Sequence, residues 1–446
     1  MMKELSQDFL NEMKELLSEN DYSEYINTLD NNYYRGIRIN TLKCSVDIAK
    51  GNLDFPLSET PFCSEGFYIP FDVEGLGNLP LHRAGGFYAQ EPSAMSAVTI
   101  LDVHKGDRVL DLCAAPGGKS TQIAADLDGS GLLWSNEIVK SRANILLSNI
   151  ERMGITNAVV SSCHPDKLCR ALGGFFDKIL VDAPCSGEGM FRRDENARDE
   201  WTAEHSHSCA DRQLAVLDSA SGALKDGGTL VYSTCTFSKY ENEDVIERFL
   251  DTHRDFELVD CGVSFGRRTL DGKAVRIYPM DGGEGHFAAK LKKSGELTPN
   301  SNNFYPIKTP EIEAAFKLYD ELFLSRCFGE RFELVGDKLL LLPNAEIPAL
   351  HGLSVIRAGV LFGEVKKNRI EPCHALFMAA KKSQLRSFVD LQSGDKRLEA
   401  FFRGEEIGID SGLSGFTAVL ADGLTVGFGK AVDGVLKNKY PKGLRG

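Results

Sequence analysis

Short apolar runs alternate with helical patterns between residues 95 and 293. The runs typical of β-strands are 108–113, 132–137, 157–162, 178–183, 229–235, 256–260 and 286–293. Between the second and third runs, residues 140–154 carry apolar side chains at helical spacing (Ile145, Leu146, Ile150 and Met153) and end at Gly154. Strands alternating with helices predict a parallel sheet with crossover helices, which is an α/β fold.

The regions on either side of this alternation have different patterns. Residues 1–94 begin with an acidic amphipathic helix pattern and continue into turn-rich sequence. The polar, turn-rich segment 292–306 is typical of a linker. Residues 307–446 form short strand patterns separated by turns. We therefore expect an amino-terminal α+β extension (1–94), a Rossmann-like domain (95–293) and a carboxyl-terminal region (307–446).

Composition and charge narrow the class of protein. The net charge of −13 argues against a protein that coats nucleic acid nonspecifically, but the charge is uneven: residues 1–30 carry −6 and residues 430–446 carry +4. We expect no membrane span, since no apolar run approaches the roughly 18–20 residues it needs, and no secretory signal. Eleven cysteines without any C-x-x-C pair indicate reduced thiols, a cytoplasmic protein and no bound metal.

The strongest local signal is the sequence RVLDLCAAPGGKSTQIA at 108–124, where a strand runs into a glycine turn and then a helix. Gly117 and Gly118 allow close approach of backbone to a ligand, and the helix amino terminus offers free N–H groups. Glu137 ends the next strand, where an acid hydrogen-bonds ribose hydroxyls in doubly wound folds. Asp182 ends the fourth strand at the same edge. Together these residues predict an adenosine-containing ligand.

A nucleoside-triphosphatase is the alternative for this loop, because GGKST followed by KILVD imitates its phosphate-binding motifs. That motif needs a glycine at position 113, which is Cys113 here. The alanines and proline of the turn cannot supply the same ring of amides. We therefore reject this alternative.

Two cysteines follow strands at this edge, Cys185 in DAPCSGEG and Cys235 in STCT. A thiol is the group that cytosine methylation requires, because carbon 5 of the ring is a poor nucleophile. Attack of a thiolate on carbon 6 makes carbon 5 reactive towards a methyl sulfonium. Asp182 near N3 and the amino group would stabilise the charge that develops there. The residues alone do not decide which thiol attacks.

The motifs CAAPGGKS, SNE, DAPCSGEGMFRRD and YSTCTFSKYENE jointly resemble the Sun/Nol family of RNA cytosine-5 methyltransferases, in particular the bacterial RsmF-type enzymes of 16S ribosomal RNA. The resemblance extends to HRAGGFYAQEPSAM (82–95), GEVKKNRIEPCHAL (363–376) and KNKYPKGLR (437–445). It implies a class I S-adenosylmethionine-dependent methyltransferase sheet, an RNA-binding amino-terminal extension and a PUA-like RNA-binding region at 307–446.

The resemblance also implies roles for individual residues. Cys235 would be the nucleophile that forms an adduct with carbon 6, and Cys185 would assist release of the product. Residues that would hold S-adenosylmethionine are Cys113, Ala114, Ala115, Pro116, Gly117, Gly118, Lys119, Glu137, Asp182 and, on the following helix, Arg142. RNA-binding side chains would be Arg192, Arg193, Lys366, Lys367, Arg369, Lys437, Lys439, Lys442 and Arg445. Tyr440 would either stack on a base or pack under the tail.

Two departures from the family pattern affect the details. Relatives carry an acid after the third strand that contacts adenine; this chain has Cys163 or His164 there, with Asp166 nearby. Pro279-Met280 stands where relatives have Pro-His. The first departure keeps open a second class of protein, a catalytically weak assembly factor that binds ribosomal RNA. The same chemistry on transfer RNA is a further alternative, and we expect a monomer.

Overall fold

The computed structural model describes residues 5–299, 312–367 and 369–445. A central sheet organises the molecule, with the strand order β11-β12-β13-β9-β8-β5-β6-β7-β16 and β10 paired to β13. Five strands are parallel: β5 (Arg108–Asp111), β6 (Leu132–Asn136), β7 (Ala158–Ser161), β8 (Phe176–Asp182) and β9 (Leu224–Thr234). The others are β10 (Phe256–Val259), β11 (Arg267–Thr269), β12 (Ala274–Ile277), β13 (His286–Lys293) and β16 (Val355–Ala358). The α/β prediction is confirmed, and every predicted strand is present.

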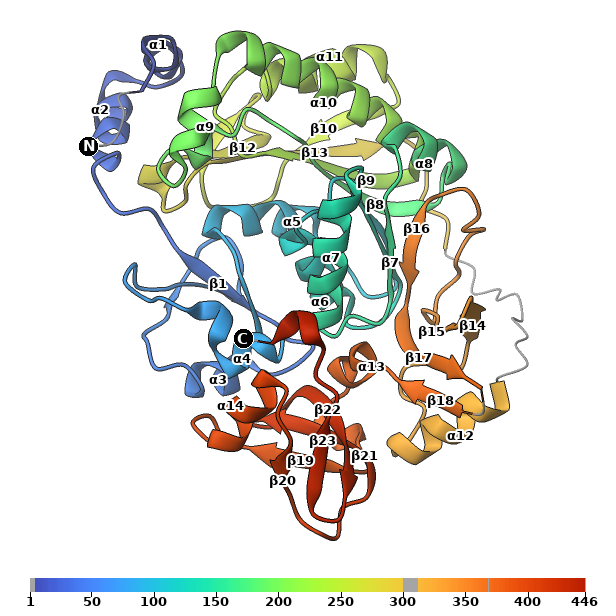
Figure 1. Cartoon of the computed structure of the whole chain (residues 1–446). Helices are drawn as coiled ribbons and strands as arrows, with labels where there is room; N and C mark the ends of the chain where they lie inside the picture. Colours follow the sequence, from blue (N-terminus) through green and yellow to red (C-terminus); the bar gives the residue numbers. More distant parts are fainter. Residues whose placement is uncertain (1–4, 300–311, 368, 446) are drawn as a thin grey trace.

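Helices cover both faces of this sheet (Figure 1). They are α5 (Ser96–Leu101), α6 (Gly118–Leu127), α7 (Lys140–Arg152), α8 (Pro165–Ala171), α9 (Glu195–Glu200), α10 (Ala203–Ala223) and α11 (Glu243–Thr252). Alternate strand residues face opposite layers, so that Leu110 packs with α8, α10 and α11 while its neighbour Val109 packs with α5, α6 and α7. The sheet therefore has two buried faces, as in doubly wound folds.

The amino-terminal region is a small sheet with helices at its edges. Its elements are α1 (Gln7–Leu16), α2 (Glu19–Thr28), β1 (Gly36–Ile39), α3 (Val46–Gly51), β2 (Ser58–Glu59), β3 (Gly66–Tyr68), α4 (Pro80–Arg83) and β4 (Phe87–Ala89). The helices α1 and α2 bury Phe9 and Tyr25 against Phe191, Trp201 and Phe237 of the central domain. This packing brings the amino-terminal region against the loop that follows β8.

The carboxyl-terminal region contains two further sheets. The elements of the first are α12 (Ile312–Leu322), β14 (Phe332–Val335), β15 (Lys338–Leu341), β17 (Val360–Lys366) and β18 (Arg369–Pro372). Those of the second are α13 (His374–Ala379), β19 (Phe388–Leu391), α14 (Lys396–Arg403), β20 (Ile407–Gly408), β21 (Gly415–Ala421), β22 (Leu424–Val432) and β23 (Val435–Asn438). The predicted linker 292–306 begins inside β13, and its part from residue 300 lies outside the described residues.

The strand β16 differs from the sequence prediction, because it leaves its own region to join the central sheet. It pairs antiparallel with β7, and Arg357 forms an ion pair with Glu151 of α7 (2.6 Å). In Figure 1 this orange strand lies beside β7. The carboxyl-terminal region also contacts the amino-terminal region through α14, where the guanidinium of Arg83 lies 4.6 Å from the Phe402 ring centroid. The two outer regions are thus packed together as well as against the central domain.

Candidate active site

The loop between β5 and α6 forms the floor of the site. Gly117 has φ +114°, a conformation that side chains rarely adopt, and a Cβ there would lie 3.1 Å from Leu146. The loop is tied down from outside by Asn149, whose amide donates to the Pro116 carbonyl (2.9 Å), and by Arg142, which donates to the Ala115 carbonyl (3.0 Å). The seven-residue stretch 113–119 predicted to face the cofactor is therefore held in one shape by α7.

Acidic and amide side chains line the ends of β5 and β6. Glu137 is buried, forms an ion pair with Arg142 (3.2 Å) and accepts from the Val139 amide (2.9 Å). Arg142 thereby joins Glu137 to the loop. Asn136, which sequence reasoning missed, donates to the carbonyls of Leu112 and Cys163. Its place directly before Glu137 at a strand end is the signal that could have indicated it.

A cavity of about 800 Å³ opens next to this loop. Cys113, Ile138, His164, Asp166 and Pro184 are among the residues that line it. Cys163 is instead buried, with burial raising the pKa of its thiol, so His164 and Asp166 are the residues after β7 that face the cavity. Asp166 also forms an ion pair with Arg170 (2.7 Å).

Asp111 lies beneath the same loop. Its Oδ2 accepts from Ser120 (2.6 Å), whereas Oδ1 is buried and lacks a hydrogen-bond partner among the described residues. Burial raises the pKa of Asp111 to about 7. An unpaired carboxylate oxygen, a rigid glycine loop and an acid after β6 fit the polar half of an adenosine-containing ligand, and the adjoining cavity has room for its rings.

Lys119 and Asp182 form a partly buried ion pair between the loop and the end of β8. Their charged atoms are 2.8 Å apart, and Ser233 donates to the other carboxylate oxygen (2.8 Å). Burial would raise the pKa of Asp182, but the Lys119 ammonium, His286 and the Ser233 hydroxyl together outweigh burial and hold that pKa below its usual value. Asp182 is therefore a carboxylate at neutral pH. One of its oxygens accepts from Lys119 and the other accepts from Ser233.

The two cysteines singled out by their strand-end positions meet in space. Cys185 follows β8, Cys235 follows β9, and their sulfur atoms are 3.3 Å apart. The hydrogen bond with Cys235 and burial raise the pKa of Cys185 well above its ordinary value. Cys185 is therefore a protonated thiol at neutral pH, which is not the nucleophilic form.

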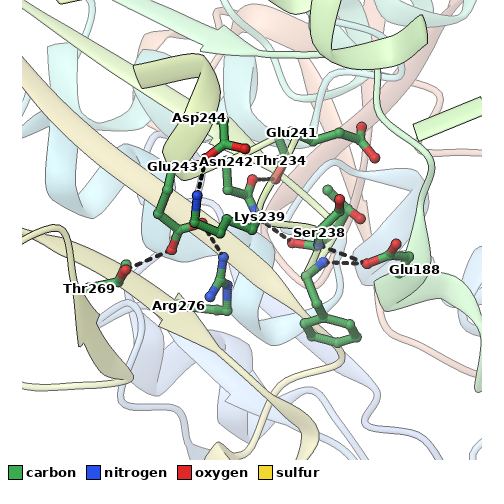
Figure 2. A network of polar contacts seen from close by, with 12 residues as sticks. Glu188, Thr234, Ser238, Lys239, Glu241, Asn242, Glu243, Asp244, Thr269 and Arg276 are labelled. Atoms are coloured by element: carbon green, nitrogen blue, oxygen red, sulfur yellow. Dashed lines mark hydrogen bonds and ion pairs between the residues drawn. The ribbon is translucent and has the colours of Figure 1, made fainter. Parts of the chain in front are cut away.

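A buried polar network fixes the backbone on either side of Cys235 (Figure 2). Glu188 accepts from the amides of Phe237 (2.8 Å) and Ser238 (2.9 Å), and Asn242 accepts from Thr234 (2.6 Å). In the same view, Glu243 accepts from Arg276 (2.6 Å) and Thr269 (2.6 Å). The thiol thus projects from a loop held at both ends.

Glu241 extends this network to the other cysteine. Its carboxylate is fully buried and accepts from the Ser186 amide (3.0 Å), Gln213 (2.7 Å) and Ser206 (2.9 Å). Sequence reasoning quoted YENE as a motif but gave Glu241 no role. Its three donors come from elements 28 to 55 residues away, which no local pattern indicates.

Arg192 differs from its prediction as a phosphate contact. It is buried in an ion pair with Glu284 (3.0 Å) and donates to the carbonyls of Asn31 and Asn32. The Arg192 side chain therefore links the loop after β8 to the amino-terminal region. Its neighbour Arg193 is exposed, with its guanidinium 5.6 Å from the Tyr33 ring centroid.

The basic residues of the carboxyl-terminal region lie on the surface. Those predicted to bind RNA and found exposed are Lys366, Lys367, Arg369, Lys437, Lys439, Lys442 and Arg445. Lys366 and Arg369 pair with Glu364 and Glu371, both at 2.5 Å. Tyr440 is buried against Phe401, Phe402 and His374, so it packs under the tail rather than offering its ring to a base.

The described ranges contain no cluster of three metal-ligating side chains. Within the same ranges, no helix has the length and apolar character to cross a bilayer.

The doubly wound sheet, the glycine loop with its acids, and the strand-end thiols define an S-adenosylmethionine-dependent methyltransferase with added domains. Sequence models of four domains match the chain: the 16S rRNA methyltransferase RsmB/F domain (98–292), the RsmF amino-terminal domain (5–92), the first RsmF carboxyl-terminal domain (319–379) and the RsmF PUA domain (388–446). The chain therefore belongs to the RsmB/F family of 16S rRNA methyltransferases, whose methyl donor is S-adenosylmethionine.

Full-length relatives agree with this assignment. Ribosomal RNA small subunit methyltransferase F of Vibrio vulnificus is 34% identical over 99% of this chain and 97% of the relative. The protein of the same name from Klebsiella pneumoniae is 33% identical over 95% and 92%. Among solved structures, a methyltransferase homolog protein from Pyrococcus horikoshii is 29% identical and covers 65% of this chain and all of its own, with a TM-score of 0.55.

Proposed function

We propose that this protein methylates carbon 5 of cytosine in 16S ribosomal RNA, with Cys235 as the nucleophile. The observation that carries the proposal is the pair of thiols 3.3 Å apart at the end of β8 and β9, directly beside the Lys119–Asp182 ion pair. Membership of the RsmB/F family and the names of the full-length relatives support 16S ribosomal RNA as the substrate.

The different surroundings of the two thiols support a division of labour between them. Cys185 is held protonated, whereas the ammonium of Lys119 lies close enough to Cys235 for their charges to interact. A cation beside the sulfur is the surrounding expected of an attacking cysteine. We therefore assign the attack on carbon 6 to Cys235 and the donation of a proton to Cys185.

Asp182 is placed to read and activate the base. As a carboxylate it accepts a hydrogen bond from the exocyclic amino group of cytosine, which uracil lacks. The addition of the Cys235 thiolate to carbon 6 turns the ring into an enamine, and its carbon 5 carries the nucleophilic electrons. S-adenosylmethionine, held by the 113–119 loop and Glu137, supplies an electrophilic methyl group. Removal of the carbon 5 proton then expels the thiolate and restores the ring.

Cys185 is our candidate for the group that assists that last step, because its S–H can donate a hydrogen bond to the departing Cys235 thiolate while solvent water takes the carbon 5 proton. Its sulfur lies within reach of Cys235, and Glu241 fixes the backbone one residue further along. The remote basic residues at 366–369 and 437–445 would hold RNA through phosphate contacts, so binding should weaken with salt. A protein with this substrate would act in the cytoplasm.

The experiment is transfer of tritiated methyl groups from S-adenosylmethionine to purified 16S ribosomal RNA, small ribosomal subunits and transfer RNA. Nucleoside chromatography of the product should give 5-methylcytidine from one of the two ribosomal substrates. Label in transfer RNA alone would keep the chemistry and overturn the substrate. The affinity for S-adenosylmethionine distinguishes the enzyme from an assembly factor that only binds ribosomal RNA. An assembly factor with a degenerate cofactor site would not bind S-adenosylmethionine.

A further inference from the structure

A small cleft lies between the amino-terminal region and the loop that follows Cys185. Its volume is about 240 Å³, and its walls include Tyr33, Tyr34, Arg35, Gln90, Glu91 and Arg193. We refer to it as the Tyr33 cleft. Neither the family motifs nor the catalytic network described above uses the two tyrosines.

The cleft adjoins the catalytic loops at both ends. Gln90 packs against the cofactor loop, where a Cβ on Gly118 would lie 3.3 Å from the Gln90 amide carbon. At the other end, Arg193 closely follows Gly189, whose amide donates to the Cys235 carbonyl (2.9 Å). RNA that delivers a cytosine to Cys235 therefore has this cleft as an immediate neighbour.

The buried ion pair of Arg192 and Glu284 holds the cleft in shape. Glu284 accepts from Arg192 (3.0 Å) and from the Tyr34 amide (2.6 Å), and Arg192 donates to the Asn32 carbonyl (2.7 Å). These bonds fix the backbone on both sides of Tyr33. The cleft is thus built before any ligand binds, which lowers the entropic cost of binding.

The lining combines an aromatic ring with a cation. Arg193 lies over Tyr33 at 5.6 Å, the Phe71 ring meets Tyr33 edge-on at 5.0 Å, and Arg193 has no carboxylate within 4.0 Å in the described ranges. Glu91 turns its carboxylate to the amides of Ser93, Ala94 and Glu284 instead. The charge of Arg193 acts on Glu284, but that carboxylate is already paired with Arg192. In a chain of net charge −13, an exposed arginine without a direct ion pair beside the active site favours an anionic ligand.

We propose that the Tyr33 cleft binds the nucleotide next to the target cytosine, with its base against Tyr33 and its phosphate at Arg193. This inference rests on the proposed function. A cytosine that enters the pocket leaves its stack, so its neighbour loses a stacking partner that an aromatic ring can replace. The volume is below the range of drug-sized ligand pockets, which suits one base of a polymer rather than a free nucleotide.

Steady-state kinetics with 16S ribosomal RNA test the cleft. Tyr33→Ala and Arg193→Ala should each raise the KM for RNA by about tenfold, since stacking on an aromatic side chain contributes that much or more per base. Tyr33→Phe should keep the wild-type KM, and all variants should keep the wild-type affinity for S-adenosylmethionine. Arg193→Ala should also lower the salt dependence of RNA binding by about one phosphate contact. Arg254→Ala removes an exposed arginine on the α11–β10 turn and should change nothing.

Photocrosslinking gives a readout that does not depend on variants. Small-subunit RNA with 5-iodouridine beside the target cytosine should crosslink to the peptide that contains Tyr33. An inert wild-type protein would overturn both the proposed function and this inference. An active wild-type enzyme whose Tyr33→Ala and Arg193→Ala variants match it, or a crosslink only to peptides outside the cleft, would overturn the Tyr33 cleft alone. Variants that match an active wild-type enzyme would also be the outcome if the cleft bound a protein partner instead of RNA.

Discussion

The two thiols of the site have different surroundings although their sulfur atoms are 3.3 Å apart. Cys185 is buried against Cys235 and near the carboxylate of Glu241, and both raise the pKa of its thiol. Cys235 instead lies next to Lys119, whose ammonium is locked to Asp182. The fold thereby holds two thiols in contact, one protonated and one beside a cation, which suits the separate addition and elimination steps of the proposed reaction.

Replacement of Cys185 by alanine should separate these steps. Cys235 would still add to carbon 6 and the methyl group would still arrive, but release would slow. We expect a covalent RNA–protein adduct that survives denaturing electrophoresis, together with a turnover rate at least about 100-fold lower. Cys327→Ala, which removes an exposed thiol, is the control and should form no adduct. A Cys185→Ala enzyme with normal turnover and no adduct would contradict this role.

Single residues were predictable where strand ends determine their position. Cys235, Cys185, Asp182 and Glu137 could be placed because parallel strands end at one edge. Arg192 could not, since its partner Glu284 is 92 residues away and nothing local distinguishes it from Arg193. Tyr440 similarly depends on rings at 374, 401 and 402 that only the tertiary fold brings to it.

Among the elements, the strand β16 is the one that ties the carboxyl-terminal region to the catalytic sheet. Its pairing with β7 is flanked by hydrogen bonds from the Ser162 amide to the Ser354 carbonyl (3.0 Å) and from the Gly359 amide to the Ala158 carbonyl (2.8 Å). The predicted strands of the catalytic domain have long apolar runs. The four residues of β16 do not, and their partner lies almost 200 residues earlier, so no periodicity indicates them.

Gly359 provides a test of this junction. It has φ +66°, and a Cβ would lie 2.1 Å from the Leu341 carbonyl oxygen. Gly359→Ala should lower the free energy of unfolding by about 2 to 5 kcal/mol, from backbone strain and overlap together. Gly352→Ala is the matched control, because φ is +80° there but nothing lies within 4 Å; it should cost only about 1 kcal/mol. Chemical denaturation measures both, and equal losses would show that the close approach at Gly359 is unimportant.

At the scale of the whole molecule, half-buried histidines that resist protonation lie where the regions meet. His82 and His374 both line a crevice of about 690 Å³ where the amino-terminal, central and carboxyl-terminal regions meet. Burial lowers the pKa of each to about 4, and His286 near Asp182 is lowered to about 3. The native state therefore keeps these imidazoles neutral.

Stability should consequently fall as the solution is acidified. The unfolded chain takes up protons near pH 6.5, whereas the native state does so only near pH 4, so these histidines destabilise the fold progressively between pH 6.5 and 4. His374→Gln should flatten the dependence of the free energy of unfolding on pH over that window by about 1 to 3 kcal/mol. His351→Gln, at an exposed site, should leave it unchanged. An identical pH profile for His374→Gln and the wild type would contradict a neutral buried His374.

The central claim is cytosine-5 methylation of 16S ribosomal RNA through Cys235, and bisulfite sequencing tests it most directly. Ribosomal and transfer RNA would be sequenced from cells that lack this protein and from the same cells complemented with wild type, Cys235→Ala or Cys327→Ala. We predict that one or a few protected cytosines of 16S ribosomal RNA disappear without the protein, return with wild type and Cys327→Ala, and stay absent with Cys235→Ala. Protection restored by Cys235→Ala, or 16S ribosomal RNA unchanged by loss of the protein, would contradict the claim.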